Sequence, residues 1–200
     1  MDLRLARPDL DGPGLFRALD HDAVWEHAAG RPASPGACAQ MLAGRAEAGW
    51  LPWLVVLRRP LGVLPAGTIV GTTTYLDIVV GDARLEIGAT AYHPAVWGTA
   101  VNADAKLQLL SYAFDQLRAG RVQLKTDVRN ARSQRAIAAL GARYEGTLRR
   151  YQRRADGTVR DTAMFAITAE DWPQVRETVS RRLADRLAAQ GAAPPQVGAD

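Results

Sequence analysis

Apolar and polar side chains alternate along several short stretches of the chain, and a period of two predicts half-buried strands. Residues 121–128 give the clearest case, because Val122 and Leu124 are interleaved with Arg121 and Gln123. Residues 53–57 are continuously apolar and of strand length, which predicts a buried strand. Further strands are predicted at residues 3–7, 68–76, 143–153 and 159–167, and the turn Ala155–Thr158 predicts a hairpin between the last two.

Residues 84–92 also alternate, after a turn at residues 81–82 that predicts a hairpin with the preceding strand. One face of this strand is predicted to carry Leu85, Ile87, Ala89 and Ala91. The opposite face is predicted to carry Arg84, Glu86 and Thr90.

A second period, near 3.6 residues, predicts helices. Apolar residues step by four and three from Ala103 to Leu117, which marks a helix face that ends near Gly120. Other helices are predicted over residues 15–28, 35–49, 130–140 and 171–189, the second of them capped by Ser34 with Pro35 at its first position. Residues 191–200, which contain two adjacent prolines, are predicted to form a flexible tail.

The predicted order is strand, two helices, three strands, helix, strand, helix, two-strand hairpin and helix. A central mixed sheet with helices on both faces accounts for this order. The chain has 200 residues, which is enough for one domain with a substantial core, and we place that domain at residues 1–190.

Composition excludes several function classes. The net charge of +4 favours anionic ligands, but the aromatic content of 6% is not interleaved with the basic residues, so nucleic-acid binding is not predicted. The longest apolar run, residues 53–57, is too short for a membrane span, and the N-terminal residues show no secretory signal. A cytoplasmic location is therefore predicted.

Metal and disulfide chemistry is not predicted either. Cys38 is the only cysteine, which excludes an internal disulfide and a multi-cysteine metal site. The three histidines, His21, His27 and His93, are scattered along the chain and form no recognisable ligand spacing.

The stretch from Glu86 to Lys106 carries the strongest functional signal. It runs from an alternating strand, through a turn rich in small residues, directly into an amphipathic helix. This order places free backbone N–H groups and the positive end of a helix dipole at the end of a strand. Such a unit can hold a phosphate or diphosphate.

Three stretches of the chain together resemble the GNAT superfamily of acyl-CoA N-acyltransferases. They are Leu85–Gly88, His93–Asn102 and Asp127–Ser133, the last completed by Ala139–Ala142. Each is weakly specific alone, but they occur in the family's order and on the expected elements. The similarity runs from Leu3 to about Leu187 and is greatest to the RimJ/RimL-like branch, whose named members acetylate protein N-termini.

The resemblance implies the fold class α/β (α+β), with a central mixed, mostly antiparallel sheet of six to seven strands flanked by helices on both faces. It implies an enzyme that uses acetyl-CoA (coenzyme A) as co-substrate and needs no metal. The implied partners are acyl-CoA and an amine acceptor, without nucleic acid or membrane, and a homodimer is compatible with the family.

The family's diphosphate loop has the pattern Gln/Arg-x-x-Gly-x-Gly/Ala, which Ala95–Ala100 matches at Gly98 and Ala100. Ala95 departs from the pattern, so we expect weaker but retained coenzyme A binding through backbone N–H groups. The alternatives are a simple tight turn for this loop and a plain helix cap for Asn130. The resemblance implies that coenzyme A contacts Ala91, Tyr92, His93, Trp97, Gly98, Thr99, Ala100, Val101, Asn102, Asn130, Ser133 and Arg135.

Many relatives carry a Tyr seven residues after the Asn, which protonates the departing sulfur. This chain has Ile137 at that position, and Ser133 is the best remaining hydrogen-bond donor. Glu86 is the candidate general base, acting through water. The alternative for Glu86 is a surface carboxylate paired with Arg84.

The absence of an obvious strong base favours an acceptor of low basicity. An α-amine, with a pKa of ~7.7–8, is substantially neutral near pH 7.5, whereas a lysine amine, with a pKa of ~10.4, is not. The predicted function is therefore transfer of acetyl from acetyl-CoA to a primary amine, in particular a protein N-terminal α-amine. Cys38 lies away from the motifs, so direct attack in a ternary complex is expected rather than an acyl-cysteine intermediate.

Two other functions fit the same sequence. The first is transfer of another acyl group, such as succinyl, to a small-molecule amine, with its carboxylate recognised by arginines of the 143–167 hairpin. These are Arg149, Arg150, Arg153 and Arg154. The second is a non-catalytic acyl-CoA-binding sensor, which the missing Tyr and the substituted Ala95 would suit.

Overall fold

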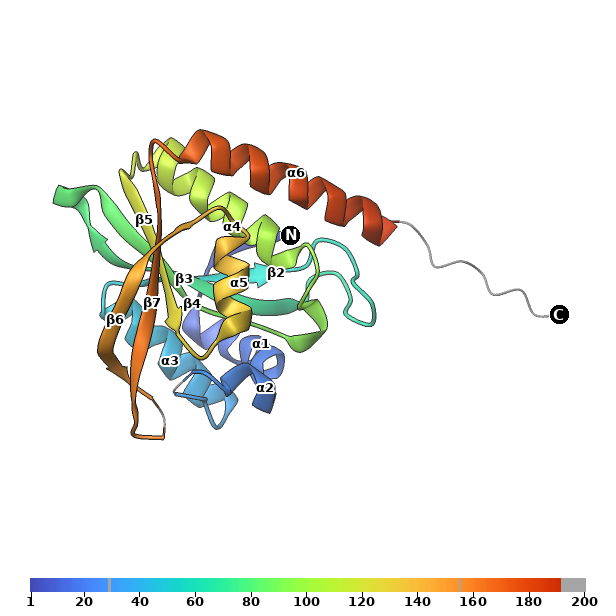
Figure 1. The fold of residues 1–200 in the computed structure, drawn as a ribbon. Helices are drawn as coiled ribbons and strands as arrows, with labels where there is room; N and C mark the ends of the chain where they lie inside the picture. The colour runs from blue at the N-terminus through green and yellow to red at the C-terminus, as the bar shows by residue number, and fades with distance from the viewer. Residues whose placement is uncertain (29, 155, 192–200) are drawn as a thin grey trace.

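The structure, a computed structural model, describes residues 1–28, 30–154 and 156–191 (Figure 1). Its strands form one seven-stranded sheet in the order β1-β2-β3-β4-β5-β7-β6. They are β1 (Asp2–Leu5), β2 (Leu51–Val56), β3 (Ile69–Val79), β4 (Arg84–Tyr92), β5 (Arg121–Asp127), β6 (Arg143–Arg153) and β7 (Val159–Thr168). The β4–β5 pair is parallel and the other neighbouring pairs are antiparallel, so the predicted mixed, mostly antiparallel sheet is confirmed.

Helices cover both faces of the sheet, as predicted (Figure 1). One face carries α1 (Pro8–Leu19), α2 (Asp22–Trp25) and α3 (Pro35–Glu47). The other face carries α4 (Val101–Ser111), α5 (Ala131–Ala138) and α6 (Trp172–Gly191). A π-helical turn, Tyr112–Gln116, continues α4, and short 3-10 turns lie at Val80–Asp82 and Pro94–Val96.

Apolar side chains from the sheet and the helices make the core. On the α4 face, Ile87 of β4 and Leu124 of β5 pack with Leu109 of α4 and Val179 of α6. The hydroxyl of Tyr75, on β3, donates to the carbonyl of Leu109 and fixes α4 over the sheet. On the opposite face, Leu15, Leu42 and Leu54 are fully buried together. Apolar burial on both sides is what makes the sheet a rigid frame for a site.

Several element boundaries differ from the prediction. The first helix begins at Pro8 rather than near residue 15, because proline at the first helical position has a suitable φ and lacks only an N–H that would be unpaired there. The Asp11 carboxylate, buried at this helix start, accepts from the Arg7 N–H and from the Arg4 guanidinium. The last helix continues to Gly191. The predicted turn residue Ala155 and residues 192–200 of the predicted tail lie outside the described residues.

The predicted alternation of β4 is wrong at its C-terminal half, because the strand contains a bulge. Ala89 and Thr90 together oppose the single residue Thr73 of β3, and Ala89 has a φ of 46°. An extra residue reverses the facing of every side chain that follows it. Thr90 therefore points toward α4, on the same face as Ile87, instead of sharing a face with Glu86.

The parallel pairing of β4 and β5 is short. It joins Arg84–Glu86 to Arg121–Gln123, whereas β4 continues to Tyr92 and β5 to Asp127. The two strands thus part in the middle of the sheet, and the loop into α4 follows directly from the free end of β4. Among the helices of the described residues, none combines the length and the apolarity that crossing a bilayer requires.

Candidate active site

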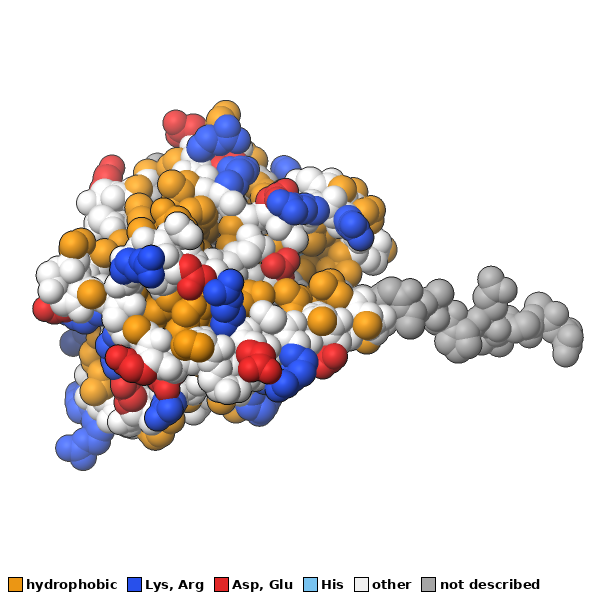
Figure 2. Space-filling model, turned by 90° about the horizontal axis from the view of Figure 1, so that it is seen from above, with side chains coloured by type: hydrophobic (Ala, Val, Ile, Leu, Met, Phe, Trp, Pro, Cys, Tyr) orange, Lys and Arg blue, Asp and Glu red, His pale blue; other side chains and the backbone are white. Residues whose placement is uncertain are grey.

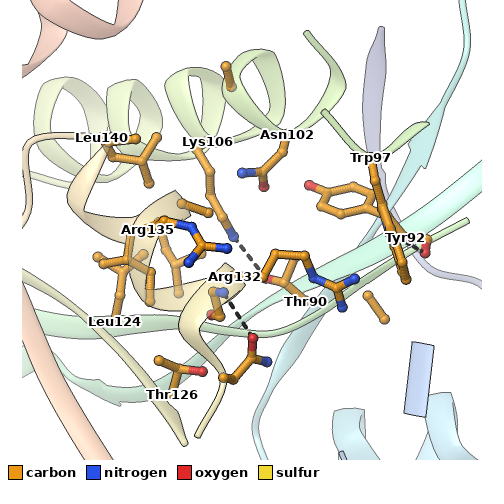
Figure 3. Close-up of a pocket in the computed structure, with 18 of the residues that line it drawn as sticks. Thr90, Tyr92, Trp97, Asn102, Lys106, Leu124, Thr126, Arg132, Arg135 and Leu140 are labelled. Atoms are coloured by element: carbon orange, nitrogen blue, oxygen red, sulfur yellow. Dashed lines mark hydrogen bonds between the residues drawn. The ribbon is translucent and has the colours of Figure 1, made fainter. Parts of the chain in front are cut away.

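A cleft of about 620 Å³ opens where β4 and β5 part. Asn102 and Lys106 of α4 line it from one face of the sheet, together with residues of α5 and α6. Val24 of α2 and the following His27 line it from the other face. Figure 3 shows side chains of α4, α5 and the strands converging on this space. Two ligands that approach from opposite faces of the sheet can therefore meet in it.

The loop between β4 and α4 presents backbone N–H groups at the cleft. Gly98, with a φ of 74°, follows the turn Pro94–Val96, and a Cβ built on it would meet nothing within 4 Å. Within the described part of the chain, the N–H groups of Gly98, Ala100 and Asn102 donate to no protein acceptor. These donors and the positive end of the α4 dipole together form a site suited to a phosphate group.

Side chains around this loop hold it in shape. The N–H of Ala95 donates to Nδ1 of His93 at 3.0 Å, so that nitrogen is the unprotonated one. Trp97 donates its indole N–H to the Tyr92 carbonyl at 3.0 Å, and Arg186 of α6 donates to the Thr99 carbonyl at 2.8 Å. The loop is thereby tied to β4 and to the last helix.

Most residues that the sequence associates with coenzyme A line the cleft: Ala91, Tyr92, Trp97, Gly98, Thr99, Asn102, Asn130, Ser133 and Arg135. The side chains of Ala100 and Val101 are buried. The N–H of Ala100 is available to a ligand, whereas that of Val101 donates to Oγ1 of Thr99. His93 lies outside the cleft, in a separate depression beside Gly14 and Arg17, where its ring contacts that of His21.

Asn130 caps α5. Its Oδ1 accepts the N–H of Ser133 at 2.9 Å, so the capping role that the residue type predicts is present. Both residues also line the cleft, and capping leaves the Asn130 amide N–H groups available to a ligand. The preceding strand end is fixed by Asp127, which is buried and paired with Arg154 at 2.6 Å.

Arginines gather on the α5 and α6 side of the cleft. The guanidinium of Arg132 lies 3.8 Å from the centre of the Trp97 ring, and Arg135, Arg182 and Arg186 line the same space. Seen from the side of α6, however, basic and acidic side chains are interspersed over the molecular surface (Figure 2). The positive charge is therefore local to the cleft on this side rather than a broad basic surface.

Glu86 is enclosed in the sheet rather than open to the cleft. Its side chain is 2% exposed and lies 2.7 Å from Nζ of Lys125, which itself lines the cleft. Burial raises the pKa of Glu86, and the hydrogen bond from Lys125 partly offsets that rise. The alternative pairing of Glu86 with Arg84 is wrong, because Arg84 pairs with Asp82.

Sequence reasoning missed Lys106. This α4 side chain is buried, and Nζ lies 2.9 Å from Thr73 Oγ1 and 2.8 Å from Thr90 Oγ1. Burial lowers its pKa to about 7. A compositional signal was present: Lys106 and Lys125 are the only lysines among 25 basic residues, and both line the cleft. No cluster of three or more candidate metal ligands occurs within the residues that the structure describes.

A family model, the acetyltransferase (GNAT) domain, matches residues 1–143, which is well over half of the 200-residue chain. The chain belongs to the GNAT acetyltransferase family. A T. thermophilus protein assigned as an acetyltransferase shares 33% sequence identity with this GNAT chain. The match covers 90% of this chain and 92% of that one, with a TM-score of 0.75.

RimJ of Mycobacterium smegmatis, solved in complex with CoA-disulfide, is 26% identical. That match covers 92% of this chain and 88% of RimJ, with a TM-score of 0.73. The uncharacterized N-acetyltransferase p20 of Bacillus licheniformis is 28% identical over 104 residues, which are 52% of this chain and 57% of that protein. The chain thus matches little more than half the length of this curated relative.

These similarities confirm the predicted family and its RimJ/RimL-like branch. The GNAT chain is an acyl-CoA-dependent acetyltransferase. These similarities favour an enzyme over the alternative of a non-catalytic acyl-CoA-binding sensor. The cleft also fits coenzyme A by its own chemistry. The free N–H groups of Gly98, Ala100 and Asn102 suit a diphosphate, and the arginines beside them suit further phosphate oxygens.

Proposed function

We propose that this chain transfers the acetyl group of acetyl-CoA to the α-amine of a protein N-terminus, by direct attack in a ternary complex. The observation that carries the proposal is the cleft at the parting of β4 and β5, lined from both faces of the sheet. Acetyl-CoA on the α4 side and an amine on the α2 side would meet there. The resemblance to the RimJ/RimL-like branch, whose named members acetylate protein N-termini, supports a protein acceptor.

The acceptor amine must be neutral when it attacks. An α-amine meets this condition near pH 7.5 without a strong base, because its pKa is ~7.7–8. Glu86 is the proposed proton acceptor, through water or through Lys125, since it is enclosed behind that lysine. Burial raises the pKa of Glu86, which makes its carboxylate a stronger proton acceptor than an exposed one.

Ser133 is proposed to hydrogen-bond the departing sulfur. It lies on the first turn of α5 and lines the cleft, while the residue that would be the family's Tyr is Ile137, an apolar side chain buried in the core. Ser133→Ala should lower turnover more than it lowers affinity for coenzyme A. Unchanged turnover would remove Ser133 from the mechanism.

Direct attack is favoured over a covalent acyl-enzyme. Cys38 lies on α3, is fully buried, and does not line the cleft. Burial raises the pKa of its thiol to about 11, which leaves almost no thiolate near neutral pH. The one cysteine of the chain is thus unsuited to act as the nucleophile.

The experiment is a coenzyme A release assay over a panel of acceptors. It compares peptides with a free N-terminus, the same peptides with a blocked N-terminus and a free lysine, and small-molecule amines. Release with the first set and loss of release on blocking support the proposal. Equal coenzyme A release from blocked, lysine-containing peptides would indicate a lysine side chain as acceptor. Release only with small-molecule amines would indicate a small-molecule acceptor, and either result would contradict the protein α-amine.

A second candidate, transfer of succinyl, has one supporting observation. Arg160 of β7 lines the cleft, where its guanidinium could meet a carboxylate, whereas Lys125 is paired with Glu86. Of the hairpin arginines expected to do this, Arg154 is committed to Asp127, whereas Arg149 and Arg153 are exposed on β6. A higher kcat/KM with succinyl-CoA than with acetyl-CoA would favour this candidate.

A further inference from the structure

Lys106 carries a titratable amine in the cleft without a counter-charge. Its side chain is 5% exposed, and its hydrogen bonds go to two neutral hydroxyls, those of Thr73 and Thr90. Within the described residues no carboxylate lies within 4.0 Å of its Nζ, whereas Lys125 is paired with Glu86. An uncompensated buried ammonium is unfavourable, so a purely structural role would be served better by an apolar side chain.

The other titratable groups that line the cleft do not relieve this cost. They are His27 after α2, Tyr92 on β4, Lys125 on β5, Arg132 and Arg135 on α5, Arg160 on β7, and Arg182 and Arg186 on α6. Each is neutral or positively charged near pH 7. Tyr75, on the strand beneath, bonds to Leu109, and Asp104 on α4 itself pairs with the N-terminal amine.

The β4 bulge brings the hydroxyl of Thr90 to Lys106. The hydroxyl oxygens of Thr73 and Thr90 lie 2.8 Å apart, and Nζ of Lys106 donates a hydrogen bond to each of them. An ammonium has three N–H groups, so two contacts leave one unassigned. Figure 3 shows the Lys106 side chain descending from α4 into the cleft, with its nitrogen beside Thr90.

The identity of the residue adds an independent argument. Basic positions in this chain are almost all arginine, and only Lys106 and Lys125 are lysine. Arginine does not give up its proton in proteins, whereas a buried lysine titrates readily. Among the Lys and Arg positions, the two that can exchange a proton therefore both lie in the cleft.

We propose that Lys106 is a proton-transfer residue of the acetyl transfer, giving its proton to the departing sulfur of coenzyme A. The acceptor nitrogen forms the C–N bond, the C–S bond breaks, and the electron pair remaining on sulfur takes a proton from the Lys106 ammonium. The acceptor nitrogen gives its proton to Glu86, as proposed above, and this proton passes on through water to return Lys106 to its ammonium form. This inference rests on the proposed acetyl transfer, and it leaves Ser133 as a hydrogen-bond donor rather than a proton source.

Two substitutions separate charge from proton exchange. Lys106→Met keeps most of the length of the side chain but removes the charge, and Lys106→Arg keeps the charge but cannot release a proton. Both are expected to lower kcat by about 10²-fold or more, the usual contribution of proton transfer, with little change in the dissociation constant of coenzyme A. Arg181→Met, which removes an exposed charge of α6, is the matched control with unchanged kinetics.

The pH profile of kcat supplies a readout that a structural role would not move. The wild-type profile should show a limb from a group with a pKa near 7, and both Lys106 variants should lack that limb. Wild-type turnover in Lys106→Arg, or persistence of the limb in Lys106→Met, would overturn the assignment. So would a loss that is confined to KM.

A spectroscopic test needs no acceptor. Because the chain has two lysines, isotopically labelled lysine side chains give two NMR signals, and Lys106→Met identifies one of them. That signal should titrate near pH 7; a midpoint near ~10, the ordinary lysine value, would contradict the proposal. If only small amines prove to be substrates, the protein acceptor is wrong, and the Lys106 variants are then tested with those amines.

Discussion

Nζ of Lys125 lies 2.7 Å from the carboxylate of Glu86, and only the lysine faces the cleft. The pair spans β4 and β5 just where their parallel ladder ends, since Glu86 is paired with Gln123 in the last register position. It therefore closes the end of the ladder and forms part of the cleft wall at the same time. The same ion pair can therefore stabilise the sheet and take part in proton transfer.

Substitutions of this pair can separate the two roles. Glu86→Gln should cost about 3–5 kcal/mol of stability, because it leaves Lys125 without a partner in a largely buried position. The double variant Glu86→Gln with Lys125→Met should recover much of that stability. If Glu86 is the base, turnover stays low in the double variant. Recovery of turnover together with stability, measured by denaturant unfolding and coenzyme A release, would reduce the pair to a structural contact.

Gly98 is expected to matter through backbone conformation. Alanine there has room for its Cβ but is strained by roughly 1–2 kcal/mol at a φ of 74°. Relief of that strain would turn the loop N–H groups away from a diphosphate. Gly98→Ala should therefore weaken coenzyme A binding in calorimetry.

The chain offers a matched control for that variant. Gly49 has a φ of 76°, equally open surroundings, and a position outside the cleft. Gly49→Ala should cost similar stability and leave coenzyme A affinity unchanged. Equal affinities in the two variants would argue against the loop as the diphosphate site.

Asn130 should contribute both to folding and to cofactor binding. Asn130→Ala removes the cap of α5 and should cost about 1 kcal/mol. Ser34 makes the equivalent contact to Ala37 at the start of α3, outside the cleft. Ser34→Ala should cost a similar amount of stability without changing coenzyme A affinity. Identical binding by the two variants would confine Asn130 to capping.

The sequence was sufficient for the features that repeat along the chain. The alternation in β5, the order of elements and the cluster of motifs from Leu85 to Ser133 led to the sheet, the helix layers and the family. These features are predictable because burial of one face of a sheet or helix imposes a regular period on the apolar residues.

Local interruptions were not predictable in the same way. A bulge at Ala89 and Thr90 leaves no compositional mark, and it changed which residues of β4 share a face. The helical period of α4 did not predict a buried Lys106, although Ala105, Leu109 and Leu110 around it are buried as well. Its burial depends on the approach of β3 and β4 in space, which a helical period cannot show.

The stability of the protein should depend on pH through Lys106. Its pKa in the folded protein is lowered to about 7, against ~10.4 in the unfolded chain. Between pH ~7 and pH ~10.4 the unfolded chain binds more protons than the folded protein at this residue, so the free energy of unfolding of the wild type should rise with pH relative to that of Lys106→Met. Below pH ~7 both states are protonated, and the difference in stability between the two proteins is constant. Lys106→Met is therefore expected to be the more stable protein at pH 6.

The gap between Lys106→Met and the wild type should narrow by up to about 1.4 kcal/mol per pH unit as the pH rises from 7 to 9. Urea unfolding of both proteins at pH 6, 7, 8 and 9 measures this directly, and other titrating groups cancel in the comparison. Arg181→Met provides the baseline, since an exposed arginine keeps its charge in both states. A gap that does not change with pH would mean that Lys106 keeps its ordinary pKa, and a lysine that stays fully charged near neutrality would be a poor proton carrier in this cleft.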